Sequence, residues 1–294
     1  MTPTRTPTAT PTPTPTKAPS FSGKLAISVK FGTGYKVYVT GFDGQGINGP
    51  DPISLDARQP MFSRDGKSLI VNGRAGNITG VFVTDSQGQA PRLLIGQDSA
   101  HWPVLSPNGA EVMFAEMTLD WKLFRRNSNG QISEVTANNR PILVRNILWS
   151  DDNRLVFKGC ETWNERPGEC GIWVTDADEI NPTRIVVGEN GWPMDARHKL
   201  LAYMSAEDGD WDIYLIPLEG GQPQNITNND CQDGLAAIAP DGKSVAYISN
   251  ESGKWGLWTV TLSNGQKQKW FDIDPQQGTI DVNNWWVERM SWTR

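Results

Sequence analysis

Short apolar runs alternate with polar turns along most of this chain, at a nearly constant spacing. A polar turn at residues 63–67 precedes the apolar run 69–71. The same succession recurs about every 44 residues, near Leu105, Trp149, Met194 and Ile238. Asp-Gly or Asn-Gly in such a turn favours a tight connection between antiparallel strands. The pattern therefore predicts a repeat array built of β-hairpins.

Two further short strands are expected after each hairpin. In the repeat that begins near Arg58 they are residues 81–83 and 92–95. The corresponding pairs are 123–124 and 133–135, 172–174 and 184–186, 213–215 and 224–226, and 257–258 and 269–271. Four antiparallel strands in a repeat of about 44 residues are typical of a β-propeller blade.

The two ends of the chain are expected to share a blade. Complete repeats begin near Arg58, His101, Arg145, Asn190 and Asp233. Residues 24–29 and 35–43 supply second, third and fourth strands without a first, whereas residues 289–292 supply a first strand without a successor. Joining them closes the ring and removes its free edges. We therefore predict an all-β, six-bladed propeller of four-stranded antiparallel blades over residues 22–294.

Residues 1–21 have a different composition. The first 20 residues hold eight Thr and six Pro, which favours an extended polyproline II chain. This composition is typical of a glycosylated stalk, and an unmodified disordered tail is the alternative. No cleavable signal is visible after Met1, so for an exported protein we expect a signal or an anchor upstream of it.

Charge and composition exclude several classes of function. The net charge of −6 argues against general nucleic-acid binding, and no apolar run is long enough for a transmembrane segment. Two histidines leave little room for a His-rich metal centre, and we predict neither a metal nor a cofactor. The 29 Gly fit a protein rich in hairpin turns, and most of the 13 Trp are expected to pack between blades, with Trp285 and Trp286 exposed.

One repeat carries a family resemblance. Residues 238–249 read IAPDGKSVAYIS, and WGLW follows at 255–258. Residues 201–205, 208–214 and 225–227 repeat the same pattern. This repeat resembles that of TolB-like propellers, a WD-like family whose blades carry a Ser-Pro-Asp-Gly turn. The resemblance implies a six-bladed propeller; its members include periplasmic TolB, surface proteins and the propeller halves of oligopeptidases. Residues 152–153 and 197–198 depart from the Asp-Gly turn.

Cys160 and Cys170 are expected in the hairpin between the second and third strands of one blade. A hairpin brings two such positions close together, which favours a disulfide. Free buried thiols or a metal pair are the alternatives. A disulfide indicates an oxidising compartment, so we predict a protein that is extracellular, at the cell surface or periplasmic. Cys231 has no partner in the sequence and is expected to be a buried, inert thiol.

The mouth of the central channel is the candidate ligand site. The first strand of each blade lines the axis of a propeller, so its opening residues form a ring. Mixed charges and aromatic side chains converging on a cleft are typical of a site for a small ligand or peptide. The alternative is a solvated ring whose charges pair with one another. The predicted residues are Arg58, His101, Trp102, Arg145, Asn190, Trp192, Asp233 and Glu288.

Three weaker motifs remain. The alternating carboxylates of residues 208–212 superficially suit calcium, but a solvated turn is the simpler interpretation. Asn77, Asn225 and Asn250 open glycosylation sequons. No Gly-x-Ser-x-Gly nucleophile motif is present, which excludes an oligopeptidase.

Three classes of function remain. The preferred hypothesis is a non-enzymatic recognition module of the cell surface or envelope, which binds a protein, peptide or glycan at one face of the propeller. It could be tethered through sequence upstream of Met1. A self-assembling surface or filament subunit is the second. A carbohydrate-active enzyme is the third, with Asp233 and Glu288 as acid and base at the channel mouth.

Overall fold

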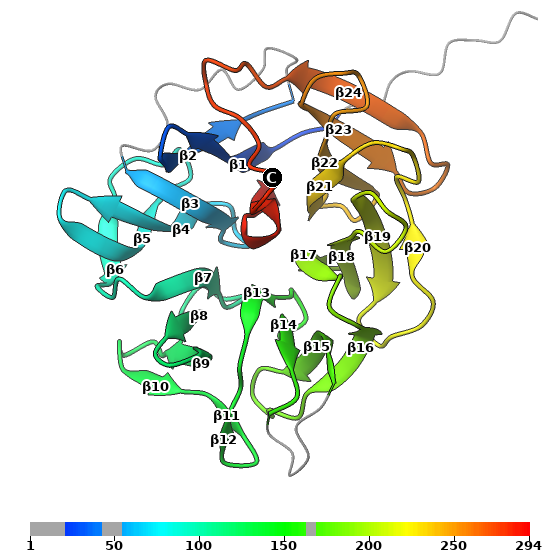
Figure 1. Ribbon diagram of the computed structural model, residues 1–294. Helices are drawn as coiled ribbons and strands as arrows, with labels where there is room; N and C mark the ends of the chain where they lie inside the picture. The colour runs from blue at the N-terminus through cyan, green and yellow to red at the C-terminus, as the bar shows by residue number, and fades with distance from the viewer. Residues whose placement is uncertain (1–20, 43–54, 163–168) are drawn as a thin grey trace, which may run out of the picture.

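Six antiparallel sheets surround a central axis and form a six-bladed β-propeller (Figure 1). The computed structural model describes residues 21–42, 55–162 and 169–294. The Thr/Pro-rich segment predicted at residues 1–21 lies outside these ranges except for Phe21. No helix in the described part of the chain is long and apolar enough to cross a membrane.

Five blades each contain four strands that run outward from the axis in chain order. Blade 2 contains β3 (Asp56–Phe62), β4 (Ser68–Ala75), β5 (Ile78–Asp85) and β6 (Arg92–Ile95). Blade 3 contains β7 (Ala100–Leu105), β8 (Val112–Met117), β9 (Trp121–Arg126) and β10 (Ile132–Glu134). Blade 4 contains β13 (Arg145–Trp149), β14 (Arg154–Cys160), β15 (Cys170–Asp176) and β16 (Thr183–Val187).

The last two complete blades follow the same plan. Blade 5 contains β17 (Trp192–Arg197), β18 (Leu200–Ser205), β19 (Asp212–Pro217) and β20 (Gln224–Asn225). Blade 6 contains β21 (Asp233–Ile238), β22 (Ser244–Ser249), β23 (Gly256–Thr261) and β24 (Lys267–Asp272). The predicted repeat boundaries are therefore confirmed to within a few residues. A small hairpin of β11 (Thr136–Ala137) and β12 (Arg140–Pro141), which the sequence pattern did not predict, lies between blades 3 and 4.

Blade 1 joins the two ends of the chain, as predicted. Its first strand is β25 (Met290–Thr293), which pairs antiparallel with β1 (Lys24–Phe31), and β1 pairs with β2 (Gly34–Thr40). Leu25 lies opposite Trp292 in this pairing. The fourth strand expected from residues 35–43 is not found in their described part, and residues 43–54 lie outside the described ranges.

Polar side chains build the turn between the first and second strands of blades 2 and 3. Ser63 Oγ donates to Asp65 Oδ1 at 2.6 Å and accepts from the Ser68 amide at 3.0 Å. Gly66 completes this turn with a φ of 69°, which is in the left-handed region. Ser106 and Asn108 repeat the first of these bonds in the next blade at 2.7 Å. The serine hydroxyl and the Asp or Asn side chain thus provide hydrogen-bond partners within the turn, where backbone groups have no neighbouring strand to pair with.

The two turns that depart from Asp-Gly keep this left-handed geometry. Asn153 has a φ of 66°, and Asn tolerates that region well. His198 and Lys199 have φ values of 53° and 61°, which are less favourable for residues with long side chains. The His198 amide donates to Asp151 Oδ1 at 3.0 Å, which supports the strained turn from the neighbouring blade.

Large side chains fill the space between neighbouring blades. Trp149, Trp173 and Trp292 are buried at their repeat positions, as predicted, whereas Trp258 is only partly buried. Trp292 lies 4.6 Å from the ring of Phe42 at the junction of the two chain ends. The buried tryptophans at these repeat positions therefore serve mainly to pack neighbouring blades against each other.

Trp292→Ala is expected to test the ring closure. Removing this buried indole should lower the free energy of unfolding by roughly 3–5 kcal/mol, because it leaves a cavity where the chain ends meet. Urea denaturation followed by circular dichroism measures the change. Leu93→Ala, at a side chain that is 40% exposed on β6, is the control and should change it by less than about 1 kcal/mol. Equal losses in the two variants would show that β25 is not critical for closure.

Candidate functional site

The first strands of the blades begin at the same face of the propeller. Because the strands of each blade alternate in direction, the same face also holds the hairpins between second and third strands. We call it the entry face. It is the face at which β3, β7, β13, β17 and β21 begin.

The first strands of all five complete blades bulge, and three of these bulges present groups to the axis. The strand register shifts just after Arg58, His101 and Arg145. The next residues, Gln59, Trp102 and Asn146, have φ values of 56°, 51° and 50°. A bulge leaves backbone and side-chain groups unpaired in the sheet and redirects them. Here they are free to bond with another segment at the axis.

The segment that precedes β25 occupies the axis at the entry face. It includes the short 3-10 helix η1 (Trp285–Val287), part of the red ribbon at the centre of Figure 1. The Val287 carbonyl accepts from Gln59 Nε2 at 3.1 Å and from Trp102 Nε1 at 2.9 Å. The Trp286 carbonyl accepts from Asn146 Nδ2 at 3.1 Å. The chain's own C-terminal segment therefore forms the floor of the channel mouth.

Two charged residues anchor this segment below the surface. Arg289 is 2% exposed and donates to the Pro103 carbonyl and to Asn146 Oδ1, each at 3.3 Å. Burial lowers the pKa of Arg289 to about 10. Glu288 is 3% exposed, and it pairs with Arg58; burial raises the pKa of its carboxyl. Glu288 was predicted as a mouth residue on a first strand, which is wrong because that strand begins later, at Met290.

Five of the eight predicted mouth residues line a single pocket. This axial pocket has a volume of about 320 Å³ and lies over η1. Of the other three, Glu288 lies buried beneath Arg58, and Asn190 is exposed in the loop before β17. Asp233 is fully buried and accepts from Asn229 Nδ2 at 2.7 Å. Ligand binding by these residues stays a prediction. The pocket is lined by Arg58, Gln59, His101, Trp102, Trp121, Arg145, Trp192, Trp286 and Val287.

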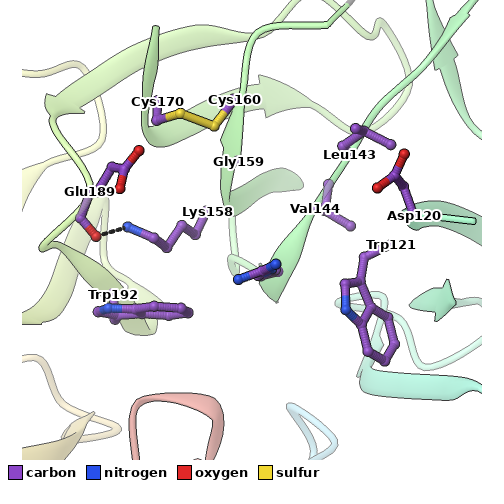
Figure 2. Close-up of a pocket in the computed structure, with 11 residues that line it drawn as sticks. Asp120, Trp121, Leu143, Val144, Lys158, Gly159, Cys160, Cys170, Glu189 and Trp192 are labelled. Carbon is purple, nitrogen blue, oxygen red and sulfur yellow. Dashed lines mark hydrogen bonds between the residues drawn. A yellow bond between two sulfur atoms is a disulfide. The ribbon is translucent and has the colours of Figure 1, made fainter.

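A second pocket adjoins the axial pocket. This side pocket has a volume of about 360 Å³ and shares Trp121, Arg145 and Trp192 with the axial pocket. Figure 2 shows Trp121 and Trp192 on opposite sides of it. The two pockets are therefore neighbours that share these three side chains. The side pocket is lined by Asp120, Trp121, Leu143, Val144, Arg145, Lys158, Gly159, Cys160, Cys170, Glu189 and Trp192.

Lys158 holds the loop that carries Trp192. Its ammonium donates to the backbone carbonyls of Glu189 and of Gly191, the latter at 2.9 Å (Figure 2). It also lies 4.6 Å from the centre of the Trp192 ring, within range of a cation–π contact. Burial lowers the pKa of Lys158 to about 8. Nothing in the sequence pattern singled this lysine out, because its partners lie in the next blade.

Seven tryptophans gather at the entry face. Trp286 stacks on Trp211 with ring centres 5.9 Å apart, and it lies 6.0 Å from Trp192. Trp285 lies 5.5 Å from Trp255 and is 1% exposed, so its predicted exposure is wrong. A Cβ at Gly234 would approach the Trp285 ring within 2.7 Å, which explains the glycine there. The set is Trp102, Trp121, Trp192, Trp211, Trp255, Trp285 and Trp286.

The sequence offered a signal for three of these indoles. Trp121 opens the third strand β9, whereas Trp211 and Trp255 stand just before the third strands β19 and β23. In an antiparallel blade the start of the third strand lies at the same face as the start of the first. The repeat position of Trp255 was predicted to be packing between blades, but its ring contributes to the entry-face cluster.

The titratable side chains of the axial pocket differ in their charge and in their partners. Burial, and then the nearby Arg58, lower the pKa of His101 to about 4, so this ring is neutral at physiological pH. Its ring packs edge-on against Trp121 at 4.8 Å. Arg58 also lies 4.4 Å from the Tyr35 ring centre. Arg145 is exposed, and no hydrogen bond or ion pair joins its side chain to another residue of the described ranges.

The predicted disulfide is confirmed. Cys160 and Cys170 lie opposite each other in the pairing of β14 with β15 and are joined by a disulfide. Both line the side pocket, so the crosslink forms part of its wall. Cys231 is a free cysteine that is only partly buried, and desolvation and Asp233 raise the pKa of its thiol.

The acidic loop 208–212 serves the fold of blade 5. Asp212 is buried and accepts from Thr227 Oγ1 at 2.6 Å and from Asn225 Nδ2 at 2.7 Å. Within the described ranges, no group of three or more His, Cys, Asp and Glu side chains is placed to hold a metal ion.

Glycosylation at the three sequons stays a prediction. Asn77 is exposed in the turn between β4 and β5. The side chain of Asn225 already binds Asp212, and Asn250 Oδ1 accepts from the Gln232 amide at 2.9 Å. Of the three, Asn77 is therefore the most open to modification.

Comparison with solved structures identifies the fold. No family model and no curated protein matches the chain. TolB from Acinetobacter baumannii is similar with a TM-score of 0.69 and 16% identity, over 93% of this chain and 67% of that one. A chain of the nidogen/laminin complex gives 0.58 and 12%, over 92% of this chain and 98% of that one. Oligogalacturonate lyase in complex with manganese gives 0.53 and 14%, over 85% and 74% respectively.

These similarities establish a TolB-like six-bladed β-propeller. At such low identities they show the fold and leave the function open. A lyase shares the fold, so a non-enzymatic role does not follow from fold alone.

Arg58→Ala is expected to destabilise the protein most at neutral pH. Without Arg58, the buried Glu288 carboxylate loses its counter-ion, which should lower the free energy of unfolding by roughly 3 kcal/mol at pH 7. The folded-state pKa of Glu288 is already raised and should rise further in the variant. The folded state then binds more protons than the unfolded state, so stability falls as pH rises. The deficit should therefore shrink between pH 7 and pH 5.

Urea denaturation of the wild type and the variant across this pH range measures the effect. Arg58→Ala combined with Glu288→Gln is the matched control, since it has no carboxyl to titrate at this position. A deficit that is independent of pH in the single variant would contradict the buried ion pair.

His101 is expected to titrate near pH 4. Its folded-state pKa lies below its unfolded value of about 6.5, so His101 adds stability as pH rises from about 4 to 6.5. NMR of the imidazole nitrogens measures the midpoint, and His198→Gln assigns the signals by removing the other histidine. A midpoint above pH 6 would show that water reaches the ring freely.

Proposed function

We propose that this protein is a non-enzymatic recognition module of the cell surface or envelope, which binds a protein, peptide or glycan at the entry face. The observation that carries the proposal is the pair of adjacent pockets at this face, the axial pocket and the side pocket. Trp121, Arg145 and Trp192 stand where the two pockets meet.

The chemistry of these two pockets favours recognition. Partly exposed tryptophans offer large, rigid contact areas, and arginine adds charge and directed hydrogen bonds. These residue types dominate binding energy in protein interfaces. The disulfide wall and the Lys158 bonds hold two sides of the side pocket in place, so less conformational entropy is lost on binding.

An exported location fits the same features. The Cys160–Cys170 disulfide indicates an oxidising compartment. We therefore propose that the entry face lies outside the cytoplasm.

The alternative enzyme hypothesis required Asp233 and Glu288 to act as acid and base at the channel mouth. Asp233 and Glu288 are 0% and 3% exposed, so neither can reach a substrate in the axial pocket. The carboxylates that do line the side pocket are Asp120 and Glu189. Because oligogalacturonate lyase shares the fold, these two are the residues to test if an activity is found.

Trp192→Ala and Arg145→Ala are expected to weaken binding of the natural partner roughly tenfold or more, because both side chains border both pockets. Envelope extracts identify the partner by cross-linking to the full chain, and biolayer interferometry then measures its affinity. Arg92→Ala, on the outer strand β6, is the matched control and should bind as the wild type does. Retained affinity in both test variants, with unchanged thermal unfolding, would move the site away from the entry face.

A further inference from the structure

Large apolar side chains are exposed mainly at the entry face. Among the described residues, eight large hydrophobic side chains are exposed, and six of them lie at this face. The other two, Leu93 and Ile132, lie on the outer strands β6 and β10. An exposed apolar surface concentrated on one face indicates a contact surface. The six are Phe31, Ile78, Met117, Leu119, Val187 and Val282.

Three of these side chains adjoin lining residues of the side pocket, in sequence or in strand pairing. Leu119 is 97% exposed and directly precedes the lining residues Asp120 and Trp121. Met117 pairs with Trp121 across the hairpin of β8 and β9. Val187 is 67% exposed and lies opposite Gly171, next to the disulfide wall. We call Met117, Leu119 and Val187 the apolar rim.

Positive charge lies inside this rim. Arg145 lines the pocket and is exposed, and its side chain has no bonded partner among the described residues. Lys158 contributes a second positive charge, although both of its described hydrogen bonds go to backbone carbonyls. The carboxylates of Asp120 and Glu189 are also exposed and line the same pocket. An incoming carboxylate would supply the counter-ion that Arg145 lacks.

We propose that the side pocket and the apolar rim dock a segment of a partner protein that presents a bulky apolar side chain beside an Asp or Glu. This inference rests on the proposed recognition function and narrows it to one pocket and one chemistry. The apolar side chain covers the rim and contacts the indoles of Trp121 and Trp192, while the carboxylate pairs with Arg145. Burial of apolar surface and a bidentate ion pair then act on adjacent groups of the same segment.

Two other occupants fit less well. A sugar chain presents hydroxyl groups over much of its surface and leaves an apolar rim poorly covered. The chain's own residues 1–20 contain Arg5 and Lys17 but no Asp or Glu, so their charge does not suit Arg145. A separate protein segment with an acidic and apolar pair matches both features.

A random peptide library displayed on phage, selected on the full-length protein, is the first test. We expect enrichment of peptides in which Asp or Glu neighbours Trp, Phe, Leu or Met. A synthetic peptide of the enriched sequence is then titrated by calorimetry. Leu119→Asp and Arg145→Glu should each weaken its binding roughly tenfold or more. The matched controls Leu93→Asp and Arg92→Glu, both on β6, should stay within about twofold of the wild type.

A charge swap separates direct pairing from a change in fold. A peptide with its acidic residue replaced by Lys should bind the Arg145→Glu variant better than it binds the wild type. Absence of this rescue would overturn the pairing with Arg145. Equal losses in the test and control variants, or no enrichment of acidic and apolar peptides, would also overturn the inference.

Further outcomes distinguish this inference from the proposed function. Trp286 lines only the axial pocket. If Trp286→Ala abolishes binding of the cross-linked partner while Leu119→Asp does not, recognition at the entry face stands and docking at the side pocket is wrong. A glycan on an array that needs Arg145 but not Leu119 would assign the pocket to an acidic glycan instead. Dimerisation that Leu119→Asp abolishes would assign it to a second copy.

Discussion

The pairing of β25 with β1 is the constraint on which the entry face depends. It closes the ring, and it also determines where the residues just before β25 must lie. Because Met290 is held in blade 1, Glu288 and Arg289 can only descend along the axis. The Val287 carbonyl then meets the side chains of Gln59 and Trp102. The floor of the axial pocket is therefore a consequence of ring closure.

The buried charges of Glu288 and Arg289 hold the segment before β25 in one position along the axis. A guanidinium and a carboxylate lose their hydration there, and the loss is tolerable only when bonded partners replace the water. Arg289 finds a carbonyl and an amide oxygen on the first strands, and Glu288 finds Arg58. Arg58 thus serves the fold as well as the pocket. The Arg145 side chain has no such partner among the described residues and is exposed in the pocket.

The fold and the function are decided by different parts of this molecule. The blade framework is shared with TolB, with a chain of the nidogen/laminin complex and with a lyase, at identities that carry no residue-level argument. What distinguishes the chain is the chemistry of one face, where tryptophans, exposed aliphatic side chains and Arg145, whose side chain has no partner within the described ranges, lie together. The candidate functional residues therefore belong to this surface and not to the shared framework.

The sequence by itself determined the blades and the shared first blade, because both follow from a repeat that recurs along the chain. It also determined the disulfide, because the two cysteines are neighbours within one repeat. It also brought five mouth residues together correctly, from Arg58 to Trp192, since each stands at the start of a first strand. Only the tertiary structure decided that Asp233 and Glu288 are buried, that Trp285 is covered, and that Lys158 supports the loop of another blade. The physical reason is that these outcomes depend on contacts between blades and with the C-terminal segment at the axis. Such contacts join residues that are distant in sequence, and no local pattern records them.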